Sequence, residues 1–276
     1  MECKIFTCYH KNCLLLQNDI ITPIHVGKEL SKQELGLIGD NTGDNISSKN
    51  PYFCELTATY WIWKNIKADY VGLFHYRRYL NFKDNEKVEF IEHEDILTNY
   101  HIVKSKIQTL LQQYDILVPK ITKKINTSLY EHYKNEHIIS DLEVALDVIK
   151  KLYPSQYGIV YDFIKNNSQM YRCNIIVAKK EVFDAYAKWL FSILFEVEKR
   201  IQSDVMERDV YQQRVYGFLA ERLMGAFLSV HKELKIKELP LLFIEENKLK
   251  WRKHQFKKLK RKFLTAIGLG KKRWKM

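Results

Sequence analysis

A helical segment that leads almost directly into an apolar strand is the feature that most constrains this fold. Within Phe53–Asn65, Leu56, Tyr60 and Trp63 recur at three- and four-residue spacing, which predicts a helix with one buried face. A strand at Tyr70–Tyr76 follows after a short connection, and its first half is apolar. A loop, a helix and a buried strand in this order are typical of α/β folds.

The same patterns predict further elements on both sides of this unit. We expect strands at 4–8, 24–26, 116–118, 172–178 and 239–245. We expect helices at 102–113, at 129–151 with a break near 137–140, from Pro154 onward, at 180–201 and at 210–230. Residues 39–51 hold the densest cluster of Gly, Asn, Asp, Ser and Pro, which indicates a long loop. We therefore predict a single α/β domain over residues 1–247.

The basic charge of the chain belongs to its C-terminal tail. Residues 248–276 contain thirteen Lys and Arg and no Asp or Glu, while the whole chain carries a net charge of +12, so residues 1–247 are close to neutral. This argues against a nucleic-acid-binding domain, which would carry its positive charge on the domain itself. In the tail, apolar residues lie near one helical face: Leu249, Phe256, Leu259, Phe263 and Ile267. A basic helix with an apolar stripe predicts an amphipathic helix that associates with an anionic membrane surface.

Five cysteines without a CxxC pair, and no recognisable signal peptide, predict free thiols in a reducing cytoplasm. No apolar run approaches the roughly 20 residues of a membrane span. The sequence also lacks a phosphate-binding P-loop, a dinucleotide-binding GxGxxG, a GxSxG elbow and an HExxH zinc motif.

The segment HYRR at 75–78 is the strongest candidate for chemistry. It follows the buried strand without a turn residue, and ligands of open α/β sheets bind beyond the carboxyl ends of the strands. A guanidinium group can donate two parallel hydrogen bonds to two oxygens of one phosphate. The alternative is that both arginines pair with surface carboxylates. Strand alternation would send Arg77 and Arg78 to opposite faces, so that one of them meets a ligand.

Two other regions are candidates for the same site. The loop with Asp44, Asn45, Ser47 and Asn50 enters the helix next to the HYRR strand, and it is either a connector or a binding loop. The helix at 210–230 carries Arg214, Glu221 and Arg222 among apolar residues. Arg214 and Glu221 share a face, which indicates either an internal ion pair or a general base.

Together these segments resemble a known bacterial family. The runs ELTATYWIWKN and GLFHYRRY, with YDILVPK, CNIIVAKKEVF and RVYGFLAERL further on, are similar to glycosyltransferases of capsular and exopolysaccharide biosynthesis. The resemblance covers residues 4 to about 245. It implies a GT-A-like (Rossmann-like) domain with a mixed sheet between helices, and transfer of a hexose, such as galactose or galactofuranose, from a nucleotide diphosphate to a lipid-linked glycan. Such an enzyme would work at the cytoplasmic face of the bacterial plasma membrane.

The resemblance also implies roles for residues. His10, Lys11 and the Asp44–Asn50 loop would bind the donor, and His75, Arg77 and Arg78 its diphosphate. Asn174, Arg214 and Arg222 would bind the acceptor, with Glu221 as general base. GT-A enzymes usually hold a divalent metal by Asp-x-Asp at the strand end, where this chain has HYRR, so we expect no metal ligands, although manganese or magnesium dependence stays open. The alternatives are a non-enzymatic membrane- or nucleic-acid-binding protein and a transferase of sugar or polyol phosphates.

Overall fold

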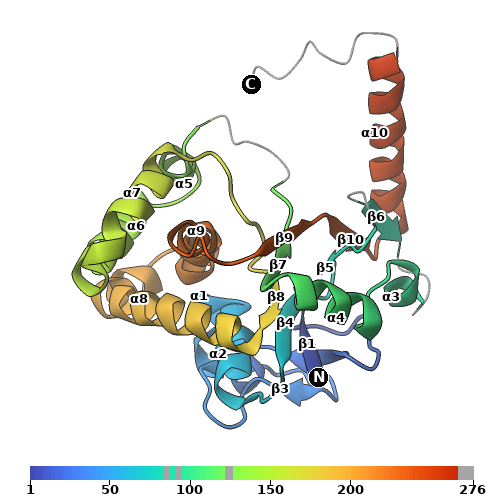
Figure 1. Ribbon diagram of the computed structural model, residues 1–276, viewed down its shortest axis with the longest axis horizontal. Coiled ribbons are helices and arrows are strands. Elements are labelled where there is room, and N and C mark those ends of the chain that lie inside the picture. The colour runs from blue at the N-terminus through green and yellow to red at the C-terminus, as the bar shows by residue number, and fades with distance from the viewer. Residues whose placement is uncertain (84–86, 91–94, 122–126, 267–276) are drawn as a thin grey trace.

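The computed structural model describes residues 1–83, 87–90, 95–121 and 127–266. Within them, ten strands form one mixed sheet with helices on both of its faces, so the predicted α/β class is confirmed (Figure 1). The strands are β1 (Cys3–Tyr9), β2 (Ile21–His25), β3 (Ile38–Gly39), β4 (Tyr70–His75), β5 (Arg78–Leu80), β6 (Lys87–Phe90), β7 (Ile116–Pro119), β8 (Ile176–Lys179), β9 (Ile236–Leu239) and β10 (Leu241–Glu245).

Strand β4 is the centre of the sheet, and the sheet forks at its carboxyl end. β4 pairs with β1 in parallel and with β8 antiparallel along Tyr70–Leu73, beyond which lie β7 and β9. Its last residue, His75, instead pairs with Arg78 of β5, which leads to β10 and β6. On this side of β4, the partner strand therefore changes from β8 to β5 between Leu73 and His75. At Gly72 a Cβ atom would lie 2.8 Å from the carbonyl oxygen of Ile176, so the pairing with β8 requires glycine there.

The helices cover the two faces unequally. They are α1 (Asn50–Phe53), α2 (Leu56–Asn65), α3 (Ile96–Asn99), α4 (Lys104–Gln113), α5 (Leu129–Glu136), α6 (Ile139–Leu152), α7 (Pro154–Asn166), α8 (Lys180–Met206), α9 (Val215–Val230) and α10 (Lys248–Ala266), with 3-10 turns at Lys28–Leu30, Ser47–Lys49 and Gln212–Arg214. Val71 and Leu73 face α2, α8 and α9, whereas Tyr70 and Phe74 face α4 on the opposite side. Alternation along β4 therefore divides the core into two halves, as expected for a strand buried on both faces.

Three predicted elements differ from the structure in their ends or their continuity. The predicted strand 70–76 ends at His75, and the chain reverses at Tyr76–Arg77 into β5. The predicted helix 53–65 is interrupted at Cys54, whose φ of +51° ends α1 before α2 begins. The predicted strand 172–178 starts only at Ile176, because Cys173 and Asn174 have φ values of +73° and +47°.

The other predicted elements are present with shifted ends. The break between α5 and α6 at His137 and Ile138 is confirmed. The predicted helix 210–230 begins with a 3-10 turn and becomes α-helical at Val215. Pro240 divides the predicted strand 239–245 into β9 and β10, because proline lacks the N–H that a continuous ladder needs. The amphipathic tail forms α10 as far as Ala266, and Ile267 lies outside the described residues.

Candidate functional site

A cavity of about 840 Å³ opens at the carboxyl ends of the parallel strands β1 and β4. Its walls come from the end of β1, the α1–α2 junction, the turn between β4 and β5, the segment before β8, the end of α5 and the start of α9. Segments from almost the whole length of the chain therefore meet here. This is the position at which open α/β sheets bind ligands.

The turn between β4 and β5 supplies the positive charge of this cleft. His75, Tyr76, Arg77 and Arg78 all line it. The turn is held by two backbone bonds: Tyr76 N donates to Cys8 O at 3.1 Å, and Ile244 N donates to Arg77 O at 2.9 Å. Within the described part of the chain, neither guanidinium forms an ion pair with a carboxylate. Both arginines can therefore bind an anion. The alternative prediction, that both pair with surface carboxylates, is wrong for the carboxylates of the described residues.

Three carboxylates line the same cleft: Glu55, Glu221 and the exposed Glu136 at the end of α5. Glu55 is the first residue after the Cys54 interruption, and its Oε1 accepts from Asn174 Nδ2 at 2.7 Å. Glu221 Oε1 accepts from Cys173 N at 2.7 Å, and its Oε2 lies 3.4 Å from Arg222 Nη1. Burial raises the pKa of Glu221. Glu55 and Glu221 thus have different hydrogen-bond environments, an arrangement suited to proton transfer.

His75 is locked between these groups. Its Nε2 lies 2.7 Å from the carbonyl oxygen of Cys173, which can only accept, so Nε2 carries the proton. Burial lowers the pKa of His75, and the Glu55 carboxylate opposes that shift. His75 is therefore a neutral, oriented ring whose N–H is already in use.

The wall opposite the turn is aromatic and basic. His137 stacks on Phe218 with the ring centroids 4.0 Å apart, and Tyr211 lies 5.1 Å from Phe218. Arg214 Nε donates to Cys54 Sγ at 3.2 Å. Flat rings beside guanidinium donors fit the faces and hydroxyls of a sugar.

Arg222 serves this wall from within. It is 2% exposed, and its guanidinium donates to Phe218 O at 2.9 Å and to His132 Nδ1 at 3.2 Å. The ring of Tyr133 lies 5.1 Å from its Cζ. These hydrogen bonds use much of the donor capacity of the guanidinium, so Arg222 supports the wall from inside the protein.

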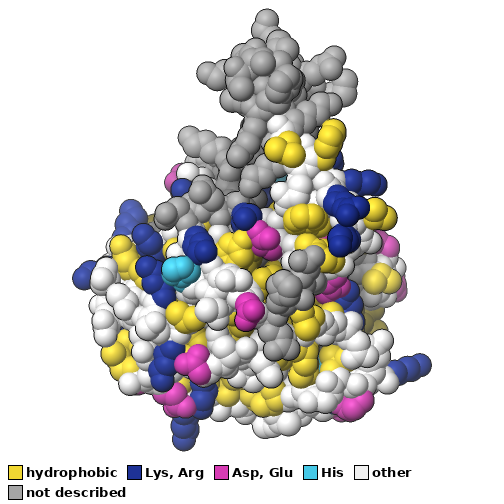
Figure 2. Space-filling model, turned by 90° about the vertical axis from the view of Figure 1, so that its right-hand side faces the viewer, with side chains coloured by type: hydrophobic (Ala, Val, Ile, Leu, Met, Phe, Trp, Pro, Cys, Tyr) yellow, Lys and Arg dark blue, Asp and Glu magenta, His cyan; other side chains and the backbone are white. Residues whose placement is uncertain are grey.

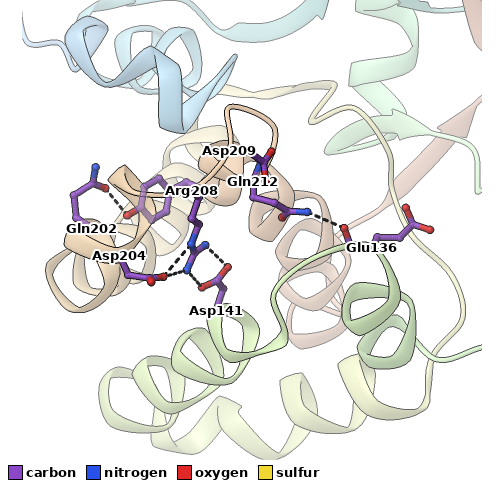
Figure 3. Close-up of polar contacts among 8 residues, drawn as sticks. Glu136, Asp141, Gln202, Asp204, Arg208, Asp209 and Gln212 are labelled. Atoms are coloured by element: carbon purple, nitrogen blue, oxygen red, sulfur yellow. Dashed lines mark hydrogen bonds and ion pairs between the residues drawn. The ribbon is translucent and has the colours of Figure 1, made fainter.

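A polar network holds the segment 207–214 that carries Tyr211 and Arg214 (Figure 3). Arg208, two residues beyond the end of α8, donates to both carboxylate oxygens of Asp141 on α6, at 2.7 and 2.8 Å. Asp209 Oδ1 accepts from two backbone amides, and Gln212 Nε2 donates to Glu136 O at 3.2 Å. The wall is therefore tied to α5 and α6 before any ligand binds.

A family model and a solved structure are both similar to this chain. A family described as a domain of unknown function, DUF4422, matches residues 4–233. The chain belongs to this family. Among solved structures, the WbbM bifunctional glycosyltransferase in its apo form is similar, with 37% identity and a TM-score of 0.80. The match covers 89% of this chain and 46% of WbbM, so the chain spans about half the length of that protein. No curated protein matches the chain.

In this DUF4422 chain, eight of the predicted site residues line the cleft: His10, Asn50, His75, Arg77, Arg78, Arg214, Glu221 and Arg222. The others lie behind it or away from it. Lys11 pairs with Glu246 at 2.9 Å, and Asn174 is 4% exposed beneath the surface. The predicted ion pair between Arg214 and Glu221 is wrong, because Arg214 contacts Cys54 and Glu221 contacts Arg222.

The predicted binding loop is braced from inside. Asp40 is fully buried and accepts from Gly27 N at 3.0 Å, Thr57 Oγ1 at 2.6 Å and Ser47 Oγ. Asp44 accepts from Tyr60 OH of α2 at 2.9 Å, and Asn45 Oδ1 accepts from Ser47 N at 3.1 Å. Of this loop, Asn50 reaches the cleft, and its Nδ2 donates to Cys54 O at 2.8 Å.

Sequence reasoning missed the cleft residues Glu55, Cys54, Cys173, His132 and His137. The sequence contains a signal for Glu55, because a charged carboxylate at the start of a helix with a buried face does not fit into the hydrophobic core. The helical period of Phe53–Asn65 concealed the interruption at Cys54.

The described residues include no group of three or more His, Cys, Asp or Glu side chains placed to hold a metal ion. Likewise, no described helix is long and apolar enough to cross a membrane.

Proposed function

We propose that the cleft is the active site of a glycosyltransferase that moves a hexose from a nucleotide diphosphate to a glycan. The observation that carries this proposal is the β4–β5 turn, where Arg77 and Arg78 line the cleft without a carboxylate partner in the described residues. The similarity to the WbbM bifunctional glycosyltransferase supports the reaction class. The chain corresponds to only part of that protein, and the chemistry of the cleft indicates where donor and acceptor bind.

The donor diphosphate lies against the turn. Transfer leaves a nucleoside diphosphate whose negative charge grows in the transition state, and fixed guanidinium groups lower the energy of that charge. Arg77 and Arg78 supply these donors. His10, whose ring lies 5.3 Å from that of Tyr76, borders the nucleotide. Galactose and galactofuranose are the candidate sugars.

The acceptor lies against the opposite wall. Arg214 and the rings of Tyr211 and Phe218 contact the acceptor sugar, and Glu55 and Glu221 are the candidates for the base that activates its hydroxyl. The exposed side chains of Leu249 and Phe256 on basic helix α10 favour attachment to an anionic membrane, where a lipid-linked glycan would be presented. Synthesis of a bacterial capsule or exopolysaccharide at the inner face of the plasma membrane fits these features.

The test combines donor binding with turnover. We expect one nucleotide-diphosphate hexose to raise the melting temperature of the protein, and we expect release of the nucleoside diphosphate when a glycan acceptor is added. Parallel measurements with manganese and with a chelator define the metal requirement. Arg77→Ala and Arg78→Ala should each lower turnover by about 10²- to 10³-fold.

Arg200→Ala is the matched control, because Arg200 pairs with Asp147 on the surface, away from the cleft. Unchanged donor affinity and turnover in both cleft variants would contradict the role of the turn. Transfer of a sugar phosphate or polyol phosphate instead of a sugar would contradict the reaction class, and so would the absence of any turnover.

A further inference from the structure

Backbone strain in the described residues gathers around one carboxylate of the cleft. Four non-glycine residues of the described chain have positive φ. His101 lies away from the cleft, whereas Cys54 at +51°, Cys173 at +73° and Asn174 at +47° lie next to Glu55 or to its neighbour His75. Cys54 directly precedes Glu55, and Asn174 is its hydrogen-bond partner. Each such residue costs about 1–3 kcal/mol, and strain of this kind persists where the surrounding structure enforces it, often at functional sites.

The strained residues fix the direction of the Glu55 side chain. Cys54 ends α1 and turns Glu55 toward the cleft, where its side chain is 13% exposed. Asn174 Nδ2 donates to Glu55 Oε1 at 2.7 Å and to Gly217 O at 3.3 Å, so that the amide is anchored on α9. His75 Nε2 lies 3.8 Å from the same oxygen and donates to Cys173 O.

The two oxygens of Glu55 are therefore not equivalent. Oε1 is held by Asn174, while Oε2 has no hydrogen-bond partner among the residues that the structure describes. Glu221 differs, because a backbone amide holds one of its oxygens and Arg222 lies beside the other. A base needs an unoccupied oxygen that is held in a fixed direction toward the cleft. Of the three carboxylates that line the cleft, Glu55 combines one held oxygen with one unoccupied oxygen, whereas Glu136 is exposed and no described residue holds its carboxylate.

We infer that Glu55 is the catalytic base of the transfer and that Asn174 is its positioning residue, an inference that rests on the proposed function. Oε2 takes the proton of the acceptor hydroxyl as the acceptor oxygen bonds to the anomeric carbon of the donor. The bond from that carbon to the diphosphate oxygen breaks, and its electron pair leaves with the diphosphate beside Arg77 and Arg78. The sugar enters no covalent bond with the protein in this step.

The experiment separates donor binding from transfer in the full chain, with the nucleotide sugar that the donor screen identifies. Glu55→Gln keeps the size of the side chain and an oxygen for Asn174. We expect its kcat for transfer to fall by at least about 100-fold, with the donor KM and the donor-induced rise in melting temperature unchanged. Glu55→Asp should retain more activity than Glu55→Gln.

Asn174→Gly tests positioning, because glycine accepts the positive φ and lacks the side chain that carries the amide group. We expect kcat to fall about tenfold, while the donor KM and the melting temperature without ligand change little. A fall in melting temperature with unchanged kcat would show a merely structural role and would overturn that part of the inference.

Glu233→Gln, an exposed carboxylate after α9, is the control and should behave as the wild type. Wild-type transfer together with an active Glu55→Gln overturns the base assignment and leaves the proposed function intact. Loss of transfer in Glu221→Gln while Glu55→Gln stays active would assign the base to Glu221. A glycosyl adduct on Glu55 detected by mass spectrometry would make it a nucleophile instead. A wild-type protein that turns over no nucleotide sugar overturns both.

Discussion

Single residues set the chemical character of the cleft. Cys54 interrupts the helix that the YWIWKN run would otherwise continue, and this one conformation brings Glu55 into the site. His137 shows the same dependence on surroundings, since it stacks on Phe218 and lies 4.9 Å from Tyr133. Its Nδ1 is buried without a hydrogen-bond partner in the described residues. Such an environment favours the neutral ring.

His137 should therefore make stability depend on pH. Burial, followed by the charge of Arg222, lowers the pKa of His137 from 6.5 to about 4. The unfolded chain takes up the proton at a higher pH than the folded protein, so the free energy of unfolding contributed by the neutral ring is complete above 6.5 and is lost as pH falls toward 4. His137→Phe keeps a ring on Phe218 and should reduce this loss by on the order of 1 kcal/mol, since partial exposure weakens the effect. Urea unfolding at several pH values measures it, and an unchanged pH dependence would contradict the assignment.

At the scale of elements, the helices of one face act as a frame for the opposite wall of the cleft. Arg208 joins the end of α8 to Asp141 at the start of α6, and both side chains are almost fully buried, at 7% and 2% exposure (Figure 3). The segment that follows Arg208 carries Tyr211 and Arg214 into the site. The position of the wall thus depends on packing between helices that are distant in sequence.

Removing one partner of this ion pair should be costly. Arg208→Met leaves the Asp141 carboxylate buried without its cation, and we expect a loss of about 3–5 kcal/mol in the free energy of unfolding. The double variant Arg208→Met with Asp141→Leu removes both charges and should recover most of that loss. Chemical denaturation of both variants provides the measurement. If Arg208→Met unfolds like the wild type, the pair does not stabilise this frame.

At the scale of the whole molecule, α10 stands away from the body at the far edge of the sheet (Figure 1). It rests on β6, where the rings of Trp251 and Phe90 are 6.0 Å apart and Gln255 Nε2 donates to Val88 O at 3.0 Å. Leu249, Phe256 and Leu259 are 68%, 70% and 64% exposed. Figure 2 views this side, where hydrophobic and Lys or Arg side chains lie next to one another near the described base of the helix. The separation of α10 from the cleft predicts separable functions.

Replacing Leu249, Phe256 and Leu259 together with serine should weaken binding to anionic vesicles by about tenfold or more, because three apolar side chains no longer enter the interface. Turnover with a soluble acceptor should stay unchanged. Leu30→Ser, at an exposed position on the main body, is the control. Cosedimentation with phosphatidylglycerol vesicles measures binding. The membrane role is wrong if the triple variant binds vesicles as well as the wild type, or if it loses affinity for nucleic acid instead of affinity for vesicles.

Much of the fold follows from local patterns. The buried strand β4, the helices of the α/β layers and the break between α5 and α6 depend on hydrophobic period and turn residues, which act over a few neighbours and can be seen in the sequence. The cationic segment at the end of β4 belongs to the same class, because a change from apolar to charged residues marks the point where a strand leaves the core.

The tertiary structure alone decided how these residues meet. Arg77 and Arg78 both reach the cleft because β5 pairs with β10, more than 150 residues away in sequence, and this long-range ladder converts the expected straight strand end into a reversal. Glu55 becomes part of the site because Asn174, from the segment before β8, holds it in place. Backbone pairing and strained φ values arise from contacts between remote segments, so the sequence determined which groups were present, and only the fold determined which of them face one another.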